Sequence, residues 1–476
     1  MSSMFPSLVQ LAEGDIYPFH MPGHKRNMPN HRLSGAYQLD ITEIDHFDNL
    51  HRPKGMIRQA QKKAADLWGA DESFFLVNGS TVGILAALSA AFPKGSEMIL
   101  ARNCHKAAYH GMLLREMKAH YLYPKLIEEG FLYGSILPDQ VEALYKKYPQ
   151  SKGVFLTSPN YDGVVSPIRE ISEIVHGHGG ILIVDEAHGA HFGLSLEFPE
   201  SAVTQGADIV IQSLHKTLPS FTQTGLLHLC SSRIQKESLQ HYLGIYQTSS
   251  PSYLFMSTME QCIEMVGREK DVLFPELSRN VDDFLYAVKN LAHLQVLNEQ
   301  FARDRGMYQF DKSKLIISTY GTNISGKELS DRLLDEYHLQ MEMACEHYVL
   351  ALTSICDRPE GFQRLAKALL EIDKSLEGSF FQHKPAGLEI FWPKEENIAF
   401  SISEAEEAKK ERLPFVRCAN RISGEFLYLY PPGVPFVVPG EYITKEMLYQ
   451  INFYKEQGLS IQGMKDDTLT YLEVIE

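Results

Sequence analysis

Short apolar runs that end in polar side chains recur through the first half of the chain. Three of them occupy residues 74–77, 181–185 and 209–211, with the sequences FFLV, ILIVD and IVI. Segments in which apolar residues recur at helical spacing alternate with them, for example at residues 54–68 and 169–177. This alternation predicts an α/β fold with a mostly parallel sheet, whose functional groups gather at the carboxyl ends of the strands.

A lysine follows one of these runs closely. The segment SLHKTLPSFTQTG, from Ser213 to Gly225, comes after the run at 209–211 and contains Lys216. A lysine ammonium is costly at a buried strand end unless it is charge-paired, desolvated for reaction or covalently bound. A loop lysine in solvent is the alternative. The run at 181–185 ends in Asp185. A carboxylate at the same predicted edge of the sheet favours a reactive lysine.

A turn of small residues follows the run at 74–77. Gly79, Ser80 and Thr81 stand between this run and an apolar helical segment. This arrangement predicts an anion site, because free backbone N–H groups and the helix dipole point into the turn and the hydroxyls add donors. No Walker-type lysine follows, and a hydrolase elbow would put Thr81 where serine is expected. His105 stands just past another strand-like run in a similar position.

Composition and charge argue against several classes of protein. The formal charge of −15 disfavours nucleic-acid binding, which needs dense Lys and Arg. The six cysteines form no C-x-x-C pair, which fits a reducing cytoplasm and gives no zinc-ligand spacing. The sequence shows neither a signal peptide nor an apolar run of about 18 residues. We therefore expect a cytoplasmic protein with no metal, no nucleic-acid partner and no membrane segment.

The length of 476 residues predicts two or three domains on one scaffold. Residues 1–45 are expected to form an N-terminal arm, and residues 46–310 a large domain that includes a long connecting helix. Residues 311–476 are expected to form a smaller α+β region, with a possible further boundary near residue 376. Within that region the sequence AEEAKKER, at residues 405–412, predicts an exposed helix face.

Together, the predicted groups are those that pyridoxal phosphate requires. Lys216 can form the imine link, Asp185 can pair with the pyridine nitrogen, and the imidazole of His105 can stack on the ring. The turn at residues 79–81 can take the phosphate. A carboxylate beside the pyridine nitrogen favours its protonated form, which makes the ring an electron sink.

Six motifs resemble those of the bacterial ornithine/lysine/arginine decarboxylases, which have the aspartate-aminotransferase fold. In chain order they are FHMPGHK, LDITEID, LVNGST, RNCHK, DEAHGAH and SLHKTLPSFTQTG. The resemblance runs from about residue 19 to about residue 260, and YPPGVPFVVPGE at residues 430–441 is similar to the family's C-terminal motif. The loop SPNYDGVV departs from the family's more aromatic version at Asp162. The chain starts almost directly at FHMPGHK, so it resembles the short form without the N-terminal wing domain.

The resemblance implies roles for individual residues. Lys216, Asp185 and His105 take the roles given above, Ala187 packs on the opposite face of the ring, and His188 is a candidate catalytic residue. The implied phosphate contacts are Gly79, Ser80, Thr81, Ser213 and His215, with Thr248 and Ser249 reaching across a dimer interface. His24, Lys25 and Glu441 are substrate candidates, with Glu441 binding the distal cationic group.

The implied reaction is the decarboxylation of a basic L-amino acid to its amine and carbon dioxide, in a homodimer or larger homo-oligomer with the site at the subunit interface. The resemblance favours arginine or lysine over ornithine. His188 or a cysteine of the second domain could donate the proton to Cα. Another pyridoxal phosphate enzyme, an aminotransferase or lyase, would keep the same cofactor residues. A metal hydrolase using His176, His178, Asp185, His188 and His191, or a binding protein without catalysis, are the remaining alternatives.

Overall fold

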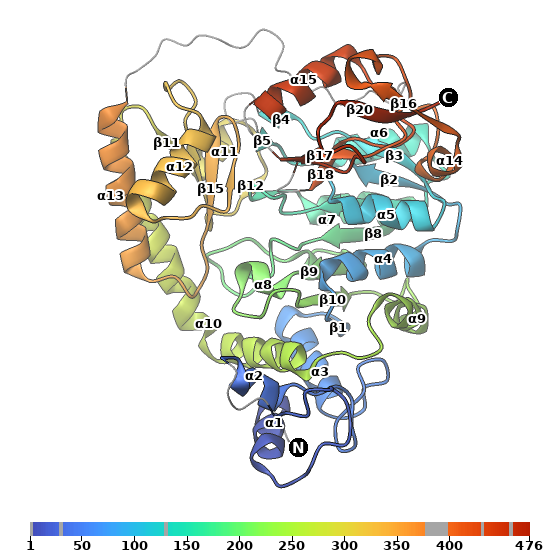
Figure 1. Cartoon of the computed structure of the whole chain (residues 1–476), viewed down its shortest axis with the longest axis vertical. Coiled ribbons are helices and arrows are strands. Elements are labelled where there is room, and N and C mark those ends of the chain that lie inside the picture. Colours follow the sequence, from blue (N-terminus) through green and yellow to red (C-terminus); the bar gives the residue numbers. More distant parts are fainter. Residues whose placement is uncertain (1–2, 28–31, 128–131, 377–397, 430–432, 457–459) are drawn as a thin grey trace. The chain divides into compact units, whose positions relative to one another are not determined.

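The computed structural model describes residues 3–27, 32–127, 132–376, 398–429, 433–456 and 460–476 (Figure 1). The chain divides into two compact units, each built from separate stretches of sequence. The first unit contains residues 1–91 and 181–275, and the second contains residues 92–180 and 276–476. The domain boundaries predicted near residues 45, 310 and 376 stay predictions.

The first unit contains four neighbouring strands in the order β1-β10-β9-β8. They are β1 (Glu72–Leu76), β10 (Gly225–Leu229), β9 (Ile209–Gln212) and β8 (Ile181–Asp185). Strands β8 and β9 are parallel, whereas β10 runs antiparallel to both β9 and β1. Strands β1, β8 and β9 therefore point the same way, and their carboxyl ends meet at one edge.

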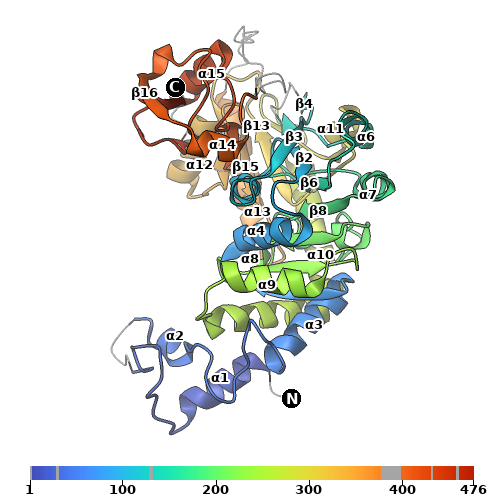
Figure 2. The same cartoon turned by 90° about the vertical axis from the view of Figure 1, so that its right-hand side faces the viewer.

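Helix α4 (Gly79–Ala91) packs across all four of these strands and against α9 (Lys236–Tyr246) (Figure 2). The close approach depends on Gly83, because a Cβ atom there would lie 2.7 Å from Leu76 Cδ1 and 3.1 Å from Ile211 Cγ2. The other helical elements that begin in this unit are α1 (Met4–Glu13), α2 (Ser34–Leu39), α3 (Met56–Trp68), η1 (Ala202–Thr204), α8 (Leu214–Thr217) and α10 (Tyr253–Ala287). Helix α4 thereby fixes the turn that follows β1 beside the ends of β8 and β9.

The second unit contains three parallel strands in the order β6-β2-β3. They are β6 (Gly153–Thr157), β2 (Glu97–Ala101) and β3 (Lys118–Leu122). The helices of this part are α5 (Lys106–Leu114), α6 (Pro138–Lys147) and α7 (Ile168–Gly177), and α6 packs on α7 and β3. In the four-stranded set of the first unit only β10 runs against the others, and β6, β2 and β3 are all parallel, so these strands are mostly parallel, as the sequence predicts.

The rest of the second unit is built from small antiparallel sheets. One has the order β11-β13-β15-β14, and another has the order β18-β17-β19. Their strands are β11 (Gln295–Val296), β13 (Lys314–Ser318), β15 (Tyr348–Leu352), β14 (Met343–Ala344), β18 (Val434–Val437), β17 (Leu427–Leu429) and β19 (Ile461–Gln462). Three two-stranded sheets are β4 (Leu126–Ile127) with β5 (Leu132–Tyr133), β7 (Val164–Val165) with β12 (Gln309–Phe310), and β16 (Lys410–Pro414) with β20 (Tyr471–Ile475). The helical elements are α11 (Glu299–Asp304), α12 (Gly326–Tyr337), α13 (Pro359–Ser375), α14 (Ile402–Glu407), η3 (Phe415–Arg417) and α15 (Lys445–Glu456).

The expected exposed helix over residues 405–412 is wrong in its second half. Helix α14 ends at Glu407, and Lys410–Pro414 form β16, which pairs with β20. Ser401 begins α14 with a capping box to Glu404, so the helical signal there is local. The strand that follows depends on residues about sixty positions downstream, which a local pattern does not contain.

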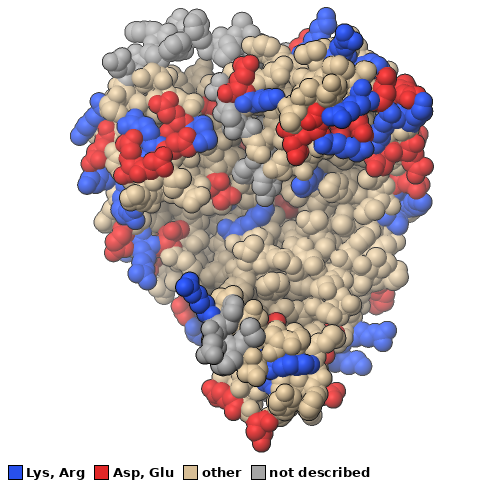
Figure 3. Space-filling model, in the orientation of Figure 1, with Lys and Arg blue, Asp and Glu red and all other residues tan. Residues whose placement is uncertain are grey.

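Charged side chains of both signs are interspersed on the face drawn in Figure 3, over the elements of the second unit. Ion pairs of the second unit include Arg412 with Asp466 and Lys465 with Glu473. Among the described helices, no helix is long and apolar enough to cross a membrane.

Candidate functional site

Asp185 is the last residue of β8, and its carboxylate is buried, with 3% of the side chain exposed. The backbone N–H of Ala187 donates to Asp185 Oδ1 at 3.1 Å. Burial raises the pKa of Asp185, and the charge of Lys216 together with the Ala187 N–H limits this rise. A buried carboxylate in this position can pair with a cationic ring nitrogen, whose charge would favour the ionised carboxylate.

Lys216 lies in the short helix α8, which follows β9. Its Nζ atom lies 3.0 Å from Nε2 of His188, a buried residue of the loop after β8. Adjacent parallel strands therefore deliver an amine and an imidazole to one point, with Asp185 at the end of one of them. This confirms the predicted placement of these groups at the carboxyl edge; their catalytic roles stay predictions.

The turn after β1 has the features of an anion site. Gly79 has a φ of +77°, and a Cβ atom built there meets nothing within 4 Å, so the turn is open on this side. The hydroxyls of Ser80 and Ser213 lie 2.7 Å apart, which joins the start of α4 to the end of β9. Thr81 is exposed in the first turn of α4. Hydroxyls and free helix N–H groups can bind a phosphate here.

His215 points its Nδ1 atom at the carbonyl oxygen of Thr224, at 2.7 Å. Because a carbonyl only accepts, Nδ1 carries the proton and Nε2 is left to accept. Burial lowers the pKa of His215, which favours this neutral form.

A buried polar chain behind the site was not predicted from the sequence. Glu186 accepts hydrogen bonds from the Ser201 hydroxyl, the Ala202 N–H and the Gln212 side-chain amide, each at 2.7 Å. Burial raises the pKa of Glu186 to about 7 against these three donors. Glu186 directly follows Asp185 in the sequence, and this adjacency is the one signal that could have revealed it.

This series of buried hydrogen bonds continues from Gln212 to the other strands. Gln212 donates through Nε2, so its Oε1 accepts from His228 Nε2 at 3.1 Å, and His228 Nδ1 accepts from the Ser73 hydroxyl at 2.8 Å. Burial lowers the pKa of His228 to about 3, which keeps this imidazole neutral. These hydrogen bonds link β1, β10, β9 and the residue after β8, and they fix the strand ends that carry Ser213 and Asp185.

The segment after α9 lies beside the phosphate turn in the same chain. The Thr248 N–H donates to Asn78 Oδ1 at 3.0 Å, and Thr248 and Ser249 are exposed. In the arm, His24 pairs with Asp40 at 3.2 Å, and Lys25 donates to the carbonyl of His20 at 2.7 Å. The reach of Thr248 and Ser249 into a partner's site and the substrate contacts of His24 and Lys25 stay predictions.

Two predicted site residues belong to the second unit. His105 is the N-cap of α5, where its Nδ1 accepts from the Ala107 N–H at 3.2 Å. Glu441 is buried and pairs with Arg102 at 3.1 Å. Ring stacking by His105 and substrate binding by Glu441 stay predictions. Residues 430–432 of the C-terminal motif lie outside the described residues.

No group of three or more His, Cys, Asp or Glu side chains in the described part of the chain could hold a metal ion. Of the histidines considered for such a site, His178 instead pairs with Glu142 at 3.0 Å and stacks on Tyr145.

The residues present fit pyridoxal phosphate. The open turn at Gly79, the paired hydroxyls of Ser80 and Ser213, the buried carboxylate of Asp185 and the amine of Lys216 meet at one strand edge of the first unit. The fold is the aspartate-aminotransferase fold, and the site has the groups that pyridoxal phosphate requires. The fold is that of the solved E. coli constitutive lysine decarboxylase, with a TM-score of 0.81 at 18% identity over 99% of this chain and 82% of that chain.

The chain belongs to the Orn/Lys/Arg decarboxylase family. Residues 2–327 match the family's major domain, and residues 395–468 match its C-terminal domain. The chain is 29% identical to a Bacillus subtilis protein named arginine decarboxylase, over 99% of this chain and 97% of that protein. It is 32% identical to the uncharacterized protein YaaO of Bacillus subtilis, over 99% of this chain and 98% of that protein. Membership of this family establishes pyridoxal phosphate-dependent decarboxylation of a basic amino acid.

Proposed function

We propose that the protein decarboxylates L-arginine to its amine and carbon dioxide. The observation that carries the reaction is the meeting of Lys216, His188 and Asp185 at the ends of two adjacent parallel strands. The likeness to an arginine decarboxylase over nearly the full length of both chains favours arginine over lysine and ornithine. Because the product is an amine, the proposed reaction belongs to polyamine-type metabolism.

Residues of the first unit would bind and orient the cofactor. When bound, pyridoxal phosphate supplies a sink for the electron pair released from the bond between Cα and the carboxylate. Lys216 would hold the cofactor covalently, and Asp185 would keep the proton on its ring nitrogen. Ser80, Ser213 and the N-terminus of α4 would bind the phosphate. Ala187, buried in the loop after Asp185, would limit ring movement.

Proton delivery falls to the pair of Lys216 and His188. Loss of carbon dioxide leaves Cα in need of a proton. The 3.0 Å separation of Lys216 Nζ and His188 Nε2 lets a proton pass between them. We assign His188 as the residue that holds this proton near Cα, with Lys216 as the group that exchanges with it.

The test is incubation of the purified protein with arginine, lysine and ornithine in turn, with measurement of released carbon dioxide and identification of the amine. We expect arginine to give the fastest turnover without a keto acid. Lys216→Ala should abolish turnover and also abolish borohydride trapping of the cofactor on the protein. Lys94→Ala is the matched control, because Lys94 is 58% exposed and pairs only with Glu116 among the ion pairs of the described residues. Full activity of Lys216→Ala, or dependence on a keto acid, would contradict the proposal.

We further propose a cytoplasmic homodimer, or a larger homo-oligomer, whose sites combine residues of two chains. The exposed hydroxyls of Thr248 and Ser249 support this assignment, because they follow α9 without being buried in their own chain. Their predicted task is to bind the cofactor phosphate of the partner.

A further inference from the structure

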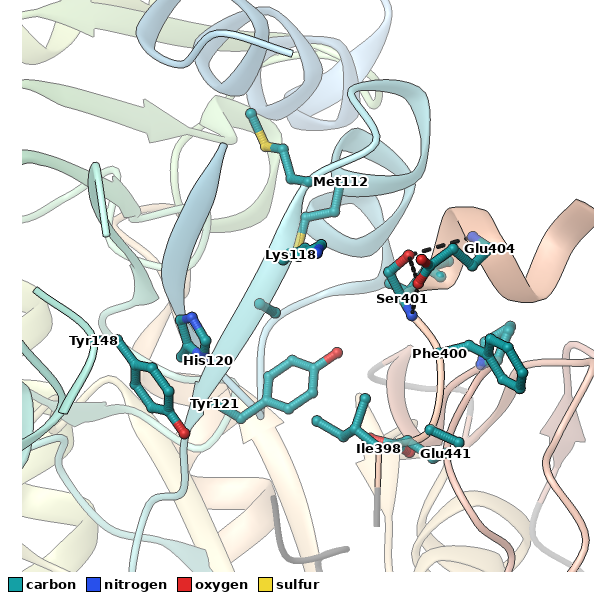
Figure 4. A pocket seen from close by; sticks show the side chains of 15 residues that line it. Met112, Lys118, His120, Tyr121, Tyr148, Ile398, Phe400, Ser401, Glu404 and Glu441 are labelled. Carbon is teal, nitrogen blue, oxygen red and sulfur yellow. Dashed lines mark hydrogen bonds between the residues drawn. The ribbon is translucent and has the colours of Figure 1, made fainter. Parts of the chain in front are cut away.

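A cavity lined only by residues of the second unit lies beside β3 (Figure 4). Its volume is ≈ 310 Å³, which is at the lower end of the size range of small-molecule sites, roughly 300–1,000 Å³. Met112, Ile398 and Phe400 contribute apolar walls, and Tyr121 and Glu441 contribute polar groups. Apolar walls with a few polar groups are the composition that small-molecule sites share.

Glu441 determines which ligands the cavity can bind. Its side chain is 1% exposed, and its Oε2 atom accepts from Arg102 Nη2 at 3.1 Å and from the Val438 N–H at 2.9 Å. Its Oε1 atom is buried and accepts no hydrogen bond from the residues that the structure describes. Leaving a buried acceptor without a donor is unfavourable, so a donor group brought by a ligand would be stabilised at this oxygen.

Tyr121 supplies a second polar group. Its hydroxyl points toward the side of the cavity where Ser401 and Phe400 lie (Figure 4). Burial raises the pKa of Tyr121 well above its usual value, so the hydroxyl keeps its proton and can donate or accept. Ser401 and Glu404 bind each other in the capping box of α14, with the Ser401 hydroxyl 2.6 Å from Glu404 Oε2. They therefore compete little for a ligand.

At their end of the cavity, Glu441 and Tyr121 favour a hydrogen-bond donor over an anion; the lining also contains Lys118 and His120 of β3, of which His120 pairs with Glu97 at 2.9 Å. Burial raises the pKa of Glu441, and the charge of Arg102 and the Val438 N–H oppose this rise. In its ionised form the carboxylate only accepts hydrogen bonds, so a ligand carboxylate or phosphate would be repelled at Glu441 Oε1. An ammonium group gives the stronger, charge-assisted bond to a carboxylate, and it brings further N–H groups for the Tyr121 hydroxyl. A short hydrocarbon stem fits the walls formed by Met112, Ile398 and Phe400.

We propose that this cavity is a binding site for a small primary amine, with the ammonium at Glu441 and Tyr121 and the stem along the apolar walls. This assignment replaces the distal substrate contact predicted for Glu441. Decarboxylation of a basic amino acid releases an amine of this kind, so the site would sense the product of the reaction. That last step rests on the proposed function, whereas the amine chemistry of the cavity does not.

The binding test uses borohydride-reduced holoenzyme, in which Lys216 is permanently linked to the cofactor and an added amine cannot displace it. Pentylamine, pentan-1-ol and pentanoate are titrated separately by calorimetry. We expect one pentylamine per chain, with pentan-1-ol binding at least about tenfold more weakly and pentanoate not binding. Absence of pentylamine binding, or equal binding of pentanoate, would overturn the proposal.

Ala119→Leu fills the cavity and leaves Glu441 and Arg102 in place, because Ala119 lines it from β3. We expect this variant to bind pentylamine at least about tenfold more weakly. Ala351→Leu is the matched control, since Ala351 is a half-buried strand residue of the same unit that does not line the cavity. Unchanged affinity in Ala119→Leu would overturn the proposal.

Carbon dioxide release by the unreduced protein separates this site from the proposed function. Activity without pentylamine binding would contradict the amine site and support the proposed decarboxylation. Pentylamine binding without carbon dioxide release would contradict the proposed decarboxylation and support the amine site.

Discussion

Asp162 is a buried carboxylate for which the structure gives a local explanation. It lies in the loop SPNYDGVV, at the position that departs from the family's aromatic version. The Tyr348 hydroxyl donates to Asp162 Oδ1 at 2.7 Å, and the Asp162 N–H donates to Asn160 Oδ1 at 3.1 Å. Burial raises the pKa of Asp162 to about 6, although Tyr348 and Lys314 oppose the rise.

The raised pKa gives Asp162 a defined effect on stability. The folded protein holds this proton up to about pH 6, whereas the unfolded chain releases it near the ordinary value of 3.8. The contribution to stability is therefore present below about pH 4 and is lost as the pH rises to about 6, by about 3 kcal/mol in total. Asp162→Asn should lack this loss, so its stability relative to the wild type should rise between pH 4 and pH 7.5.

Thermal unfolding at several pH values measures this difference. Asp335→Asn, which changes an exposed carboxylate of α12, is the control and should show no such trend. A wild-type and an Asp162→Asn protein with parallel pH profiles would contradict the expected titration.

At the scale of residues, the sequence predicts the side chains at strand ends. It does not predict which side chains of different strands contact each other. Lys216, Asp185 and Ser80 each follow or end an apolar run, so their shared edge follows from the fold class. The contact of Ser73 with His228 spans 155 positions, and that of Arg102 with Glu441 spans 339. Such pairs depend on the order of the strands and on tertiary packing, which no local pattern contains.

At the scale of elements, Asp48 of the acidic segment before α3 caps the start of this helix. Gly55, the N-cap of α3, has no side chain to cap the helix. Asp48 Oδ2 instead accepts from the N–H groups of Gly55 and Ile57 at 2.7 and 3.1 Å, and its Oδ1 accepts from the Lys54 N–H at 2.9 Å. The carboxylate also lies near the positive end of the helix dipole.

Asp48→Ala should therefore lower the free energy of unfolding by about 1–2 kcal/mol, because the first turn of α3 loses its acceptors. The midpoint of thermal unfolding is the measurement. Asp45→Ala, which removes an exposed carboxylate from the same segment, should leave that midpoint nearly unchanged. Equal shifts in the two variants would show that Asp48 does not act as a cap.

At the scale of the whole molecule, subunit mixing tests the proposed shared site. Lys216→Ala alone should be inactive, and the double variant Thr248→Val with Ser249→Ala should bind the cofactor weakly. In a mixed dimer, one site combines the intact Lys216 of one chain with the intact hydroxyls of the other. Random reassembly of equal amounts should therefore restore about a quarter of wild-type activity.

Light scattering should give at least twice the mass of one chain for the wild type and for both variants. Mixed samples that are no more active than the average of the two separate samples would place Thr248 and Ser249 within their own chain's site. A monomeric wild type would rule out the shared site altogether.

The division of the first unit into two stretches of sequence also affects how the protein is made. Strand β1 and helix α4 leave the ribosome before residue 92, but their partners β8, β9 and β10 follow only after residue 180. The apolar face of α4 therefore has no sheet to pack against while the 89 residues 92–180 of the other unit are synthesised. Contacts of such long separation form slowly and expose unpaired strands meanwhile. Synthesis of this enzyme therefore includes a period, before residue 229 emerges, in which exposed apolar surface favours aggregation.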